Sequence, residues 1–217
     1  MAYTLILAHF LGDFPLQPNW MASRKSNFWV LSLHVSIHFI VMLLLVGQVR
    51  LLIWPYLLLL TLVHMGQDRL KVALTNLWPA RTVFFFFIDQ LLHYSAIWGL
   101  TVWIRALNPN LVNTQTRLWV IIAIAYLVVT YTWYISERVI NHADAEYLKN
   151  IEETKIARML ARGGLVSLFP LVRAATLPYL AVLFSWPYPA SIYRKRALFS
   201  DVGISLLVII FLLVTLR

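Results

Sequence analysis

Long apolar segments separated by short polar turns organise this chain. They cover about residues 2–16, 28–48, 51–67, 82–104, 118–136, 165–186 and 199–216. A helix needs about 20 apolar residues to cross the hydrocarbon core of a bilayer. The pattern therefore predicts an all-α fold, a polytopic transmembrane helix bundle with six or seven spans.

Two stretches depart from this simple pattern. The segment at 165–186 contains Pro170, Arg173 and Pro178, so we expect either a kinked span or a re-entrant pair of half-helices. The stretch at 137–162 is long and charged, and its apolar positions recur at helical spacing between charges. We expect a short amphipathic helix on the membrane surface there. The interleaved charges are Lys149, Glu152, Glu153, Lys155, Arg158 and Arg162.

Four pairs of ionisable residues interrupt the first four apolar segments, and both members of each pair are four residues apart. The pairs are His9/Asp13, His34/His38, His64/Asp68 and Asp89/His93. This spacing places both side chains on one face of a helix. Burying such groups is costly unless they pair with one another or coordinate a ligand. We therefore predict a four-helix transmembrane core at 1–104 that carries one shared polar site. Further transmembrane helices follow at 105–217, with the amphipathic connection at 137–162.

Composition favours a metal at this site and restricts its ligands. The chain is 61% hydrophobic and 12% charged, where soluble domains are nearer half and a quarter, and it has no cysteine. Disulfides and thiolate ligands are thereby excluded. Five imidazoles and three carboxylates suffice for one or two divalent transition-metal ions. Mixed nitrogen and oxygen ligation suits Zn, Mn, Fe, Co or Ni, of which we favour Zn, Mn or Fe.

The basic residues indicate a membrane orientation. The net charge is +9, but Lys and Arg lie mainly between the apolar segments, which is typical of a membrane protein and argues against nucleic-acid binding. Their distribution predicts a cytoplasmic location for the first and third loops, an external N-terminus, and a site toward the cytoplasmic side of the membrane. Near the pairs, an anionic lipid headgroup could be bound by Arg24, Lys25, Arg69 and Lys71.

Three functions remain open at this point. The first is metal-dependent hydrolysis of a lipid-like phosphate or acyl ester, with Asp13, Asp68 or Asp89 as general base. The second is transport of metal ions or protons through the same residues. The third is a metal-free structural or regulatory subunit, and oligomers are compatible with each. A transporter needs polar groups across the whole bilayer, and the outer halves of the first four segments are apolar, which favours a one-sided site.

The motifs also carry a family resemblance. The stretch His9-Phe-Leu-Gly-Asp13-Phe-Pro-Leu-Gln17-Pro-Asn-Trp20 resembles the opening signature of a bacterial integral-membrane family catalogued as domain of unknown function 3307. The next three signatures are resembled, in order, by Leu33-His34 through His38, by His64 through Asp68, and by Ile88-Asp89-Gln90 through His93. The resemblance covers about residues 5–95 and implies a multi-span inner-membrane protein of no established activity. A more distant likeness, by pattern only, is to inner-membrane metal-dependent hydrolases, which also place His and Asp pairs on apolar helices.

Overall fold

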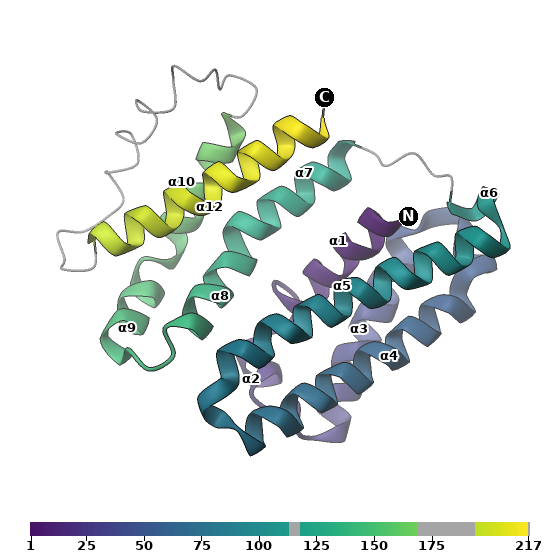
Figure 1. The fold of residues 1–217 in the computed structure, drawn as a ribbon, viewed down its shortest axis with the longest axis horizontal. Coiled ribbons are helices and arrows are strands. Elements are labelled where there is room, and N and C mark those ends of the chain that lie inside the picture. The colour runs from purple at the N-terminus through teal and green to yellow at the C-terminus, as the bar shows by residue number, and fades with distance from the viewer. Residues whose placement is uncertain (113–117, 169–193, 217) are drawn as a thin grey trace. The chain divides into compact units, whose positions relative to one another are not determined.

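The computed structural model describes residues 1–112, 118–168 and 194–216, and the regular elements in these ranges are all helices (Figure 1). The all-α class predicted from the sequence is therefore confirmed. The chain folds into two compact units, Met1–Val120 and Ile121–Arg217.

Among the described residues, five helical stretches are long and apolar enough to cross a membrane, which supports a membrane protein. They are Phe28–Leu45, Gly47–Leu77, Pro79–Leu107, Leu118–Ile140 and Lys195–Thr215. Five is fewer than the six or seven spans predicted. The first predicted segment forms a helix of only 12 residues, Ala2–Asp13, which at 1.5 Å per residue spans only about 18 Å of a core about 30 Å thick. Most of the irregular segment predicted at 165–186 lies outside the described residues.

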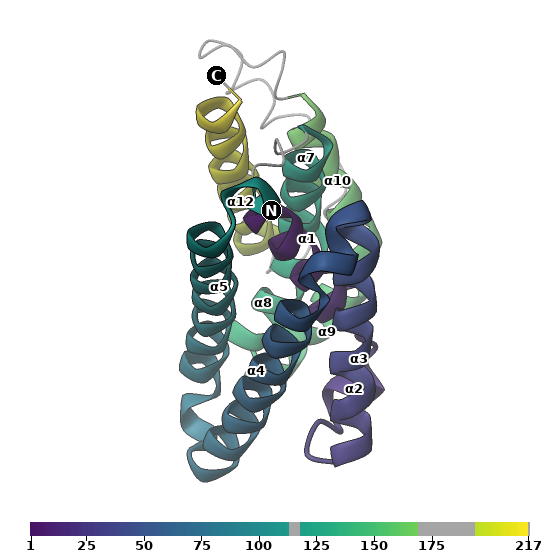
Figure 2. The same ribbon diagram turned by 90° about the vertical axis from the view of Figure 1, so that its right-hand side faces the viewer.

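The first unit is built from antiparallel neighbouring helices joined by short turns. Its elements are α1 (Ala2–Asp13), α2 (Asn19–Ala22), α3 (Phe28–Leu45), η1 (Gly47–Val49), α4 (Arg50–Leu77), η2 (Pro79–Arg81), α5 (Thr82–Leu107) and α6 (Pro109–Val112). Helix α4 packs on both α3 and α5, and α1 packs on α3 and α5 as well (Figures 1 and 2). The beginning of α3 is fixed by Asn27, whose side chain accepts hydrogen bonds from the backbone N–H groups of Trp29 and Val30.

The apolar core of the first unit occupies one end of these helices. Its buried members are Met1, Leu5, Ala8, Met42, Ile53, Leu57, Leu60, Ile97, Leu100 and Ile104. They come from the first halves of α1 and α4 and from the second halves of α3 and α5. Because the helices alternate in direction, these halves lie together. The four ionisable pairs fall in the opposite halves, so hydrophobic packing at one end leaves the other end to the polar side chains.

The part of the second unit that the structure describes is also built from helices. Its elements are α7 (Leu118–Leu127), the π-helical turn η3 (Val128–Thr132), α8 (Trp133–Ile140), α9 (Ala145–Glu153), α10 (Lys155–Ser167) and α12 (Arg194–Thr215). Helices α7 and α8 continue one another through η3, and α10 packs on both η3 and α12. A hydrophobic cluster that includes Val129, Val166 and Ile209 joins these elements.

The stretch predicted as one amphipathic surface helix at 137–162 differs from that prediction. It contains the end of α8 and two separate helices, α9 and α10, which meet at Thr154. Two of the charges expected on its polar face are buried, because Arg158 and Arg162 are each 1% exposed. Periodicity within the stretch could not show this, since the carboxylates that neutralise them come from other helices.

These two arginines lie in a closed network of buried charges. Arg158 donates to both carboxylate oxygens of Glu137, at 2.8 and 2.7 Å, and to both of Asp201, at 2.8 and 2.7 Å. Arg162 donates to Asp201 Oδ1 at 2.7 Å. It also donates to the backbone carbonyls of Val129 and Thr130, within the π-helical turn. Two guanidinium groups thus face two carboxylates, and their charges balance.

The electrostatics of Arg158 agree with this arrangement. Burial opposes its charged form, but the hydrogen bonds and charges of Asp201 and Glu137 raise its pKa above the usual value of arginine. Tyr147 completes the cluster by donating its hydroxyl to Glu137 Oε1 at 2.7 Å. We interpret the network as the structural link between α8, α10 and α12.

Candidate metal centre

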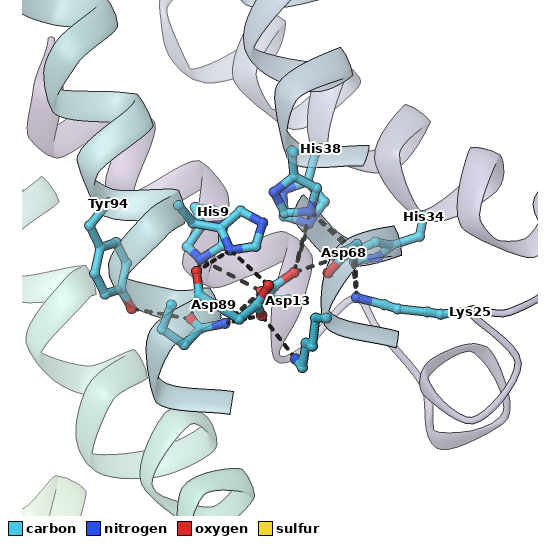
Figure 3. A network of polar contacts seen from close by, with 12 residues as sticks. His9, Asp13, Lys25, His34, His38, Asp68, Asp89 and Tyr94 are labelled. Carbon is cyan, nitrogen blue, oxygen red and sulfur yellow. Dashed lines mark hydrogen bonds and ion pairs between the residues drawn. The ribbon is translucent and has the colours of Figure 1, made fainter. Parts of the chain in front are cut away.

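The four predicted pairs lie together in the first unit (Figure 3). They lie toward the end that contains the C-terminus of α1 and the N-termini of α3 and α5. Each pair occupies one face of its helix, as the spacing of four residues predicts. The ionisable side chains are buried: His34 and Asp68 are 0% exposed, and His9, His38, Asp89 and His93 are each 2–3% exposed. The packing of four helices therefore collects groups that are up to 84 residues apart in the sequence into one polar layer.

The first set of potential ligands surrounds a single carboxylate oxygen. His38 Nε2 lies 3.1 Å from Asp13 Oδ1, His34 Nε2 lies 3.2 Å from it, and His64 Nε2 lies 3.8 Å from it. One ligand atom from each of these four residues falls within 4.8 Å of all the others. Three imidazoles and one carboxylate, converging from α1, α3 and α4, are a donor set of the type that holds a four-coordinate transition metal.

The second set consists of His64, Asp68 and His93, and it shares His64 with the first. Here His93 is oriented as metal ligands commonly are. Its Nδ1 donates to the backbone carbonyl of Asp89 at 2.7 Å, so its Nε2 carries the free lone pair. That Nε2 atom is buried and has no hydrogen-bond partner among the described residues, and neither has Asp68 Oδ1. Buried polar atoms without partners are uncommon and destabilising, so a ligand that satisfied both would stabilise the fold.

Two of the eight predicted ligands lie beside these sets and belong to neither. His9 contacts Gln90 Oε1 through its Nε2 at 3.3 Å, and its ring stacks on that of His93 at a centroid distance of 4.9 Å. Asp89 accepts a hydrogen bond from Lys71 at 2.9 Å, while its Oδ1 atom has no hydrogen-bond partner among the described residues. His9 and Asp89 therefore lie beside the ligand layer, whereas the other six predicted residues supply the donor sets.

The four basic residues predicted to bind a headgroup divide into two kinds. Arg24 and Arg69 are exposed. Lys25 is only 8% exposed and donates to Asp68 Oδ2 at 2.8 Å, and Lys71 donates to Asp89. These two contacts could not be predicted from the sequence, because the position of a lysine in the chain does not show which residue of another helix it contacts.

Charge at this end of the unit is not balanced. Three carboxylates face two ammonium groups, those of Lys25 and Lys71, so one negative charge remains while the imidazoles are neutral. The buried network of the second unit, by contrast, is neutral. An uncompensated charge in an apolar environment is costly, and a bound cation would reverse the deficit.

A small cavity adjoins the imidazole layer on its apolar side. Its volume is about 20 Å³, which suffices for one water molecule. Its lining combines polar and apolar residues: His9, His38, His64, Gln67 and His93 on one hand, and Leu5, Met42, Leu60 and Ile97 on the other. The unpartnered His93 Nε2 and Gln67 Oε1 both belong to residues of this lining. The site therefore has room for a small ligand beside the donor atoms.

The position of His38 depends on a glycine, which leads to a prediction. A Cβ atom at Gly12 would lie 2.4 Å from both Cε1 and Nε2 of the His38 ring, where carbon contacts normally need about 3.5–4.0 Å. We expect Gly12→Ala to displace His38 from the first donor set, to weaken Zn²⁺ binding, and to destabilise the fold by about 1–3 kcal/mol. Binding is measured by competition with a chromogenic chelator, and stability by thermal unfolding in detergent.

Gly66→Ala is the matched control for this substitution. A Cβ atom at Gly66, on α4, would meet nothing within 4 Å. We expect it to leave metal affinity unchanged and the helix as stable or more stable. Wild-type affinity and stability in Gly12→Ala would show that His38 does not need the position seen in the structure.

Comparison with known proteins gives one match. The profile of a family described as "Protein of unknown function (DUF3307)" matches residues 1–122, more than half of the chain. The chain belongs to this family. The matched region contains all four pairs and both donor sets. No curated protein and no solved structure matches the chain. The likeness to metal-dependent hydrolases is therefore not shown, and this family assignment brings no activity.

Proposed function

We propose that this integral membrane protein binds a divalent transition metal in its first unit and uses it to hydrolyse a phosphate or acyl ester of a lipid-like substrate. The observation that carries the proposal is the pair of buried donor sets, in which six potential ligand residues converge from four helices. Zn, Mn and Fe are the candidate metals. Because both sets require His64, they favour one ion at a time over two fully ligated ions.

The residues around the donor sets suggest how the chain would assist hydrolysis. A metal at such a site acts as a Lewis acid and makes water a better nucleophile near neutral pH. Of the three predicted candidates for general base, Asp13 and Asp68 belong to the donor sets, whereas Asp89 belongs to neither. Asp89 Oδ1 is buried and unpartnered among the described residues, so it is free to accept a proton from water.

The surroundings of the site favour a lipid-like substrate. The exposed cations Arg24 and Arg69 flank the polar end of the unit in sequence, next to Lys25 and Asp68, and would attract an anionic headgroup. The excess of basic residues on this side supports a cytoplasmic location for it, as the positive-inside rule expects. We therefore place the site at the cytoplasmic leaflet of the bacterial inner membrane, with the N-terminus outside.

A transport function, which would use the same residues, is less well supported. The end of the unit away from the site is filled by the apolar cluster that includes Leu57, Leu100 and Ile104. Two buried hydroxyls lie among these helices, but Thr61 and Thr101 both donate to backbone carbonyls of their own helix. An ion leaving the donor sets in that direction would meet no polar ligand in the described core, and crossing it would be costly.

The test is metal analysis followed by an activity screen. Protein purified in detergent without chelators is analysed by elemental mass spectrometry and is expected to contain about one equivalent of a transition metal. It is then assayed on phospholipids and acyl-ester lipids, with hydrolysis expected to disappear on chelation and to return with the metal. Metal-free wild-type protein would contradict the metal site. If the protein binds metal but hydrolyses no lipid, and if it transports metal in proteoliposomes, the function is transport and not hydrolysis.

A further inference from the structure

Lys25 contacts one potential metal-donor atom in each of the two donor sets. Its Nζ atom lies 2.8 Å from Asp68 Oδ2 and 3.0 Å from His34 Nε2 (Figure 3). His34 belongs to the first donor set and Asp68 to the second. A single ammonium group thus contacts one member of each set. Both of its contacts are fully buried, and Lys25 itself is 8% exposed.

An ammonium group and a metal ion exclude one another at these atoms. Zinc lies about 2.0–2.2 Å from a nitrogen or oxygen ligand. An ion bound to Asp68 Oδ2 or His34 Nε2 would therefore stand close to Lys25 Nζ, with no room for intervening water. Two cations at such a separation repel strongly in an environment of low dielectric constant. The lysine must therefore leave before the first donor set is completed through His34 Nε2, or the second through Asp68 Oδ2.

The backbone position of Lys25 permits this departure. It lies in the turn between α2 and α3, before the N-cap Asn27, and is not held within a long helix. Its long flexible stem can carry the ammonium group from the buried layer toward water. Its neighbour Arg24 is exposed, so the solvent is only one residue away along the chain.

We propose that Lys25 is an internal cation that neutralises the donor sets until a metal ion displaces it. The proposal rests on the metal binding proposed above. It adds that competition with the Lys25 ammonium group lowers the affinity of the site for the metal. Without metal, the ammonium group protects the fold from buried negative charge. With metal, it is released to the surface, where it faces the anionic headgroup of a substrate.

Lys71 provides the matched comparison within the same unit. It also donates to a buried carboxylate, Asp89 Oδ2, at 2.9 Å. Asp89 belongs to neither donor set, so a metal has no need to displace Lys71. Comparing substitutions of the two lysines therefore distinguishes direct competition for ligand atoms, expected of Lys25, from a general effect of positive charge near the site, expected of both.

The first experiment compares the Zn²⁺ affinities of full-length wild-type, Lys25→Met and Lys71→Met proteins in detergent by chelator competition. Methionine keeps most of the stem and removes the charge. We expect Lys25→Met to bind Zn²⁺ at least about 10-fold more tightly than wild type, and Lys71→Met to change less than about 3-fold. Equal or weaker affinity in Lys25→Met overturns the proposal while leaving the metal site intact.

The second experiment needs no variant, because Lys25→Met leaves Asp68 unpaired and is at risk of misfolding. Wild-type protein is treated with an amine-acylating reagent with and without saturating Zn²⁺, and modification of each lysine is quantified by peptide mass spectrometry. Labelling of Lys25 is expected to rise several-fold with Zn²⁺, and that of Lys71 to stay constant. Unchanged or reduced labelling of Lys25 at proven metal saturation contradicts displacement. If neither the wild type nor any variant binds Zn²⁺, the proposed function is contradicted, and the proposed displacement of Lys25 is contradicted as well.

Discussion

Replacing His64 by alanine is expected to abolish stoichiometric metal binding. His64 is common to both donor sets in the described structure, and its Nε2 lies 3.8 Å from Asp13 Oδ1 and 3.6 Å from Asp68 Oδ2. Without it, the first set keeps three donors and the second keeps two. Loss of residues that merely orient ligands weakens metal binding about 10–100-fold, so loss of a shared ligand is expected to cost about 100-fold or more.

Three further variants make this result specific to the site. His142→Ala removes an exposed histidine of the second unit and should leave the metal content at the wild-type level. Asp89→Ala removes a group outside both sets, so we expect it to retain metal and to lose hydrolysis if Asp89 is the general base. His38→Ala, which removes a donor from the first set alone, shows which of the two sets is used. Wild-type metal content in His64→Ala would exclude both sets as the binding site.

Most residues of this site could be predicted from the sequence, because the pattern that identifies them lies within single helices. Two ionisable residues four positions apart in an apolar helix must share a face, and a buried face of that kind needs partners. Four such helices in succession, joined by short turns, place the pairs at one end. What periodicity does not give is the position of one helix relative to the next. For that reason it did not separate Asp13, which lies at the centre of the first set, from Asp89, which lies outside both.

Other features had no local signal at all. The contact between Lys25 and Asp68 joins a turn to a helix 43 residues later. The close approach of Gly12 to His38 depends on how α1 packs on α3. In the second unit, Arg158 and Asp201 are likewise 43 residues apart, and each alone is typical of a solvated helix face. These contacts depend on tertiary packing, and a single charged residue in a sequence does not show which residue it will contact.

The two buried polar clusters differ in a way that bears on function. In the second unit, the guanidinium groups of Arg158 and Arg162 are matched by Glu137 and Asp201, and the network is neutral. In the first unit, three carboxylates face two ammonium groups, and donor atoms such as His93 Nε2 have no hydrogen-bond partner among the described residues. A network that only stabilises a fold has no need for unpartnered buried donor atoms. The contrast supports the proposal that the first cluster binds a ligand, whereas the second has the contacts expected of a structural network.

If the second cluster is structural, Asp201→Ala is expected to destabilise the protein by about 3–5 kcal/mol. Asp201 accepts hydrogen bonds from both buried arginines, and its removal leaves two guanidinium groups with one carboxylate. The cost comes from the uncompensated buried charge more than from the lost bonds. It is measured as the free energy of unfolding of the detergent-solubilised protein, and metal content should be unaffected.

Two comparisons decide whether charge balance is the cause. Lys149→Ala breaks an exposed pair with Glu153, whose side chains are 77% and 63% exposed, and should cost no more than about 1 kcal/mol. Adding Arg162→Met to Asp201→Ala restores neutrality, because Arg158 and Glu137 remain as a matched pair. We expect the double variant to recover part of the lost stability, so that the two substitutions are not additive. A double variant less stable than Asp201→Ala would show that Arg162 acts through its bonds to Val129 and Thr130 in the π-helical turn, and not through its charge.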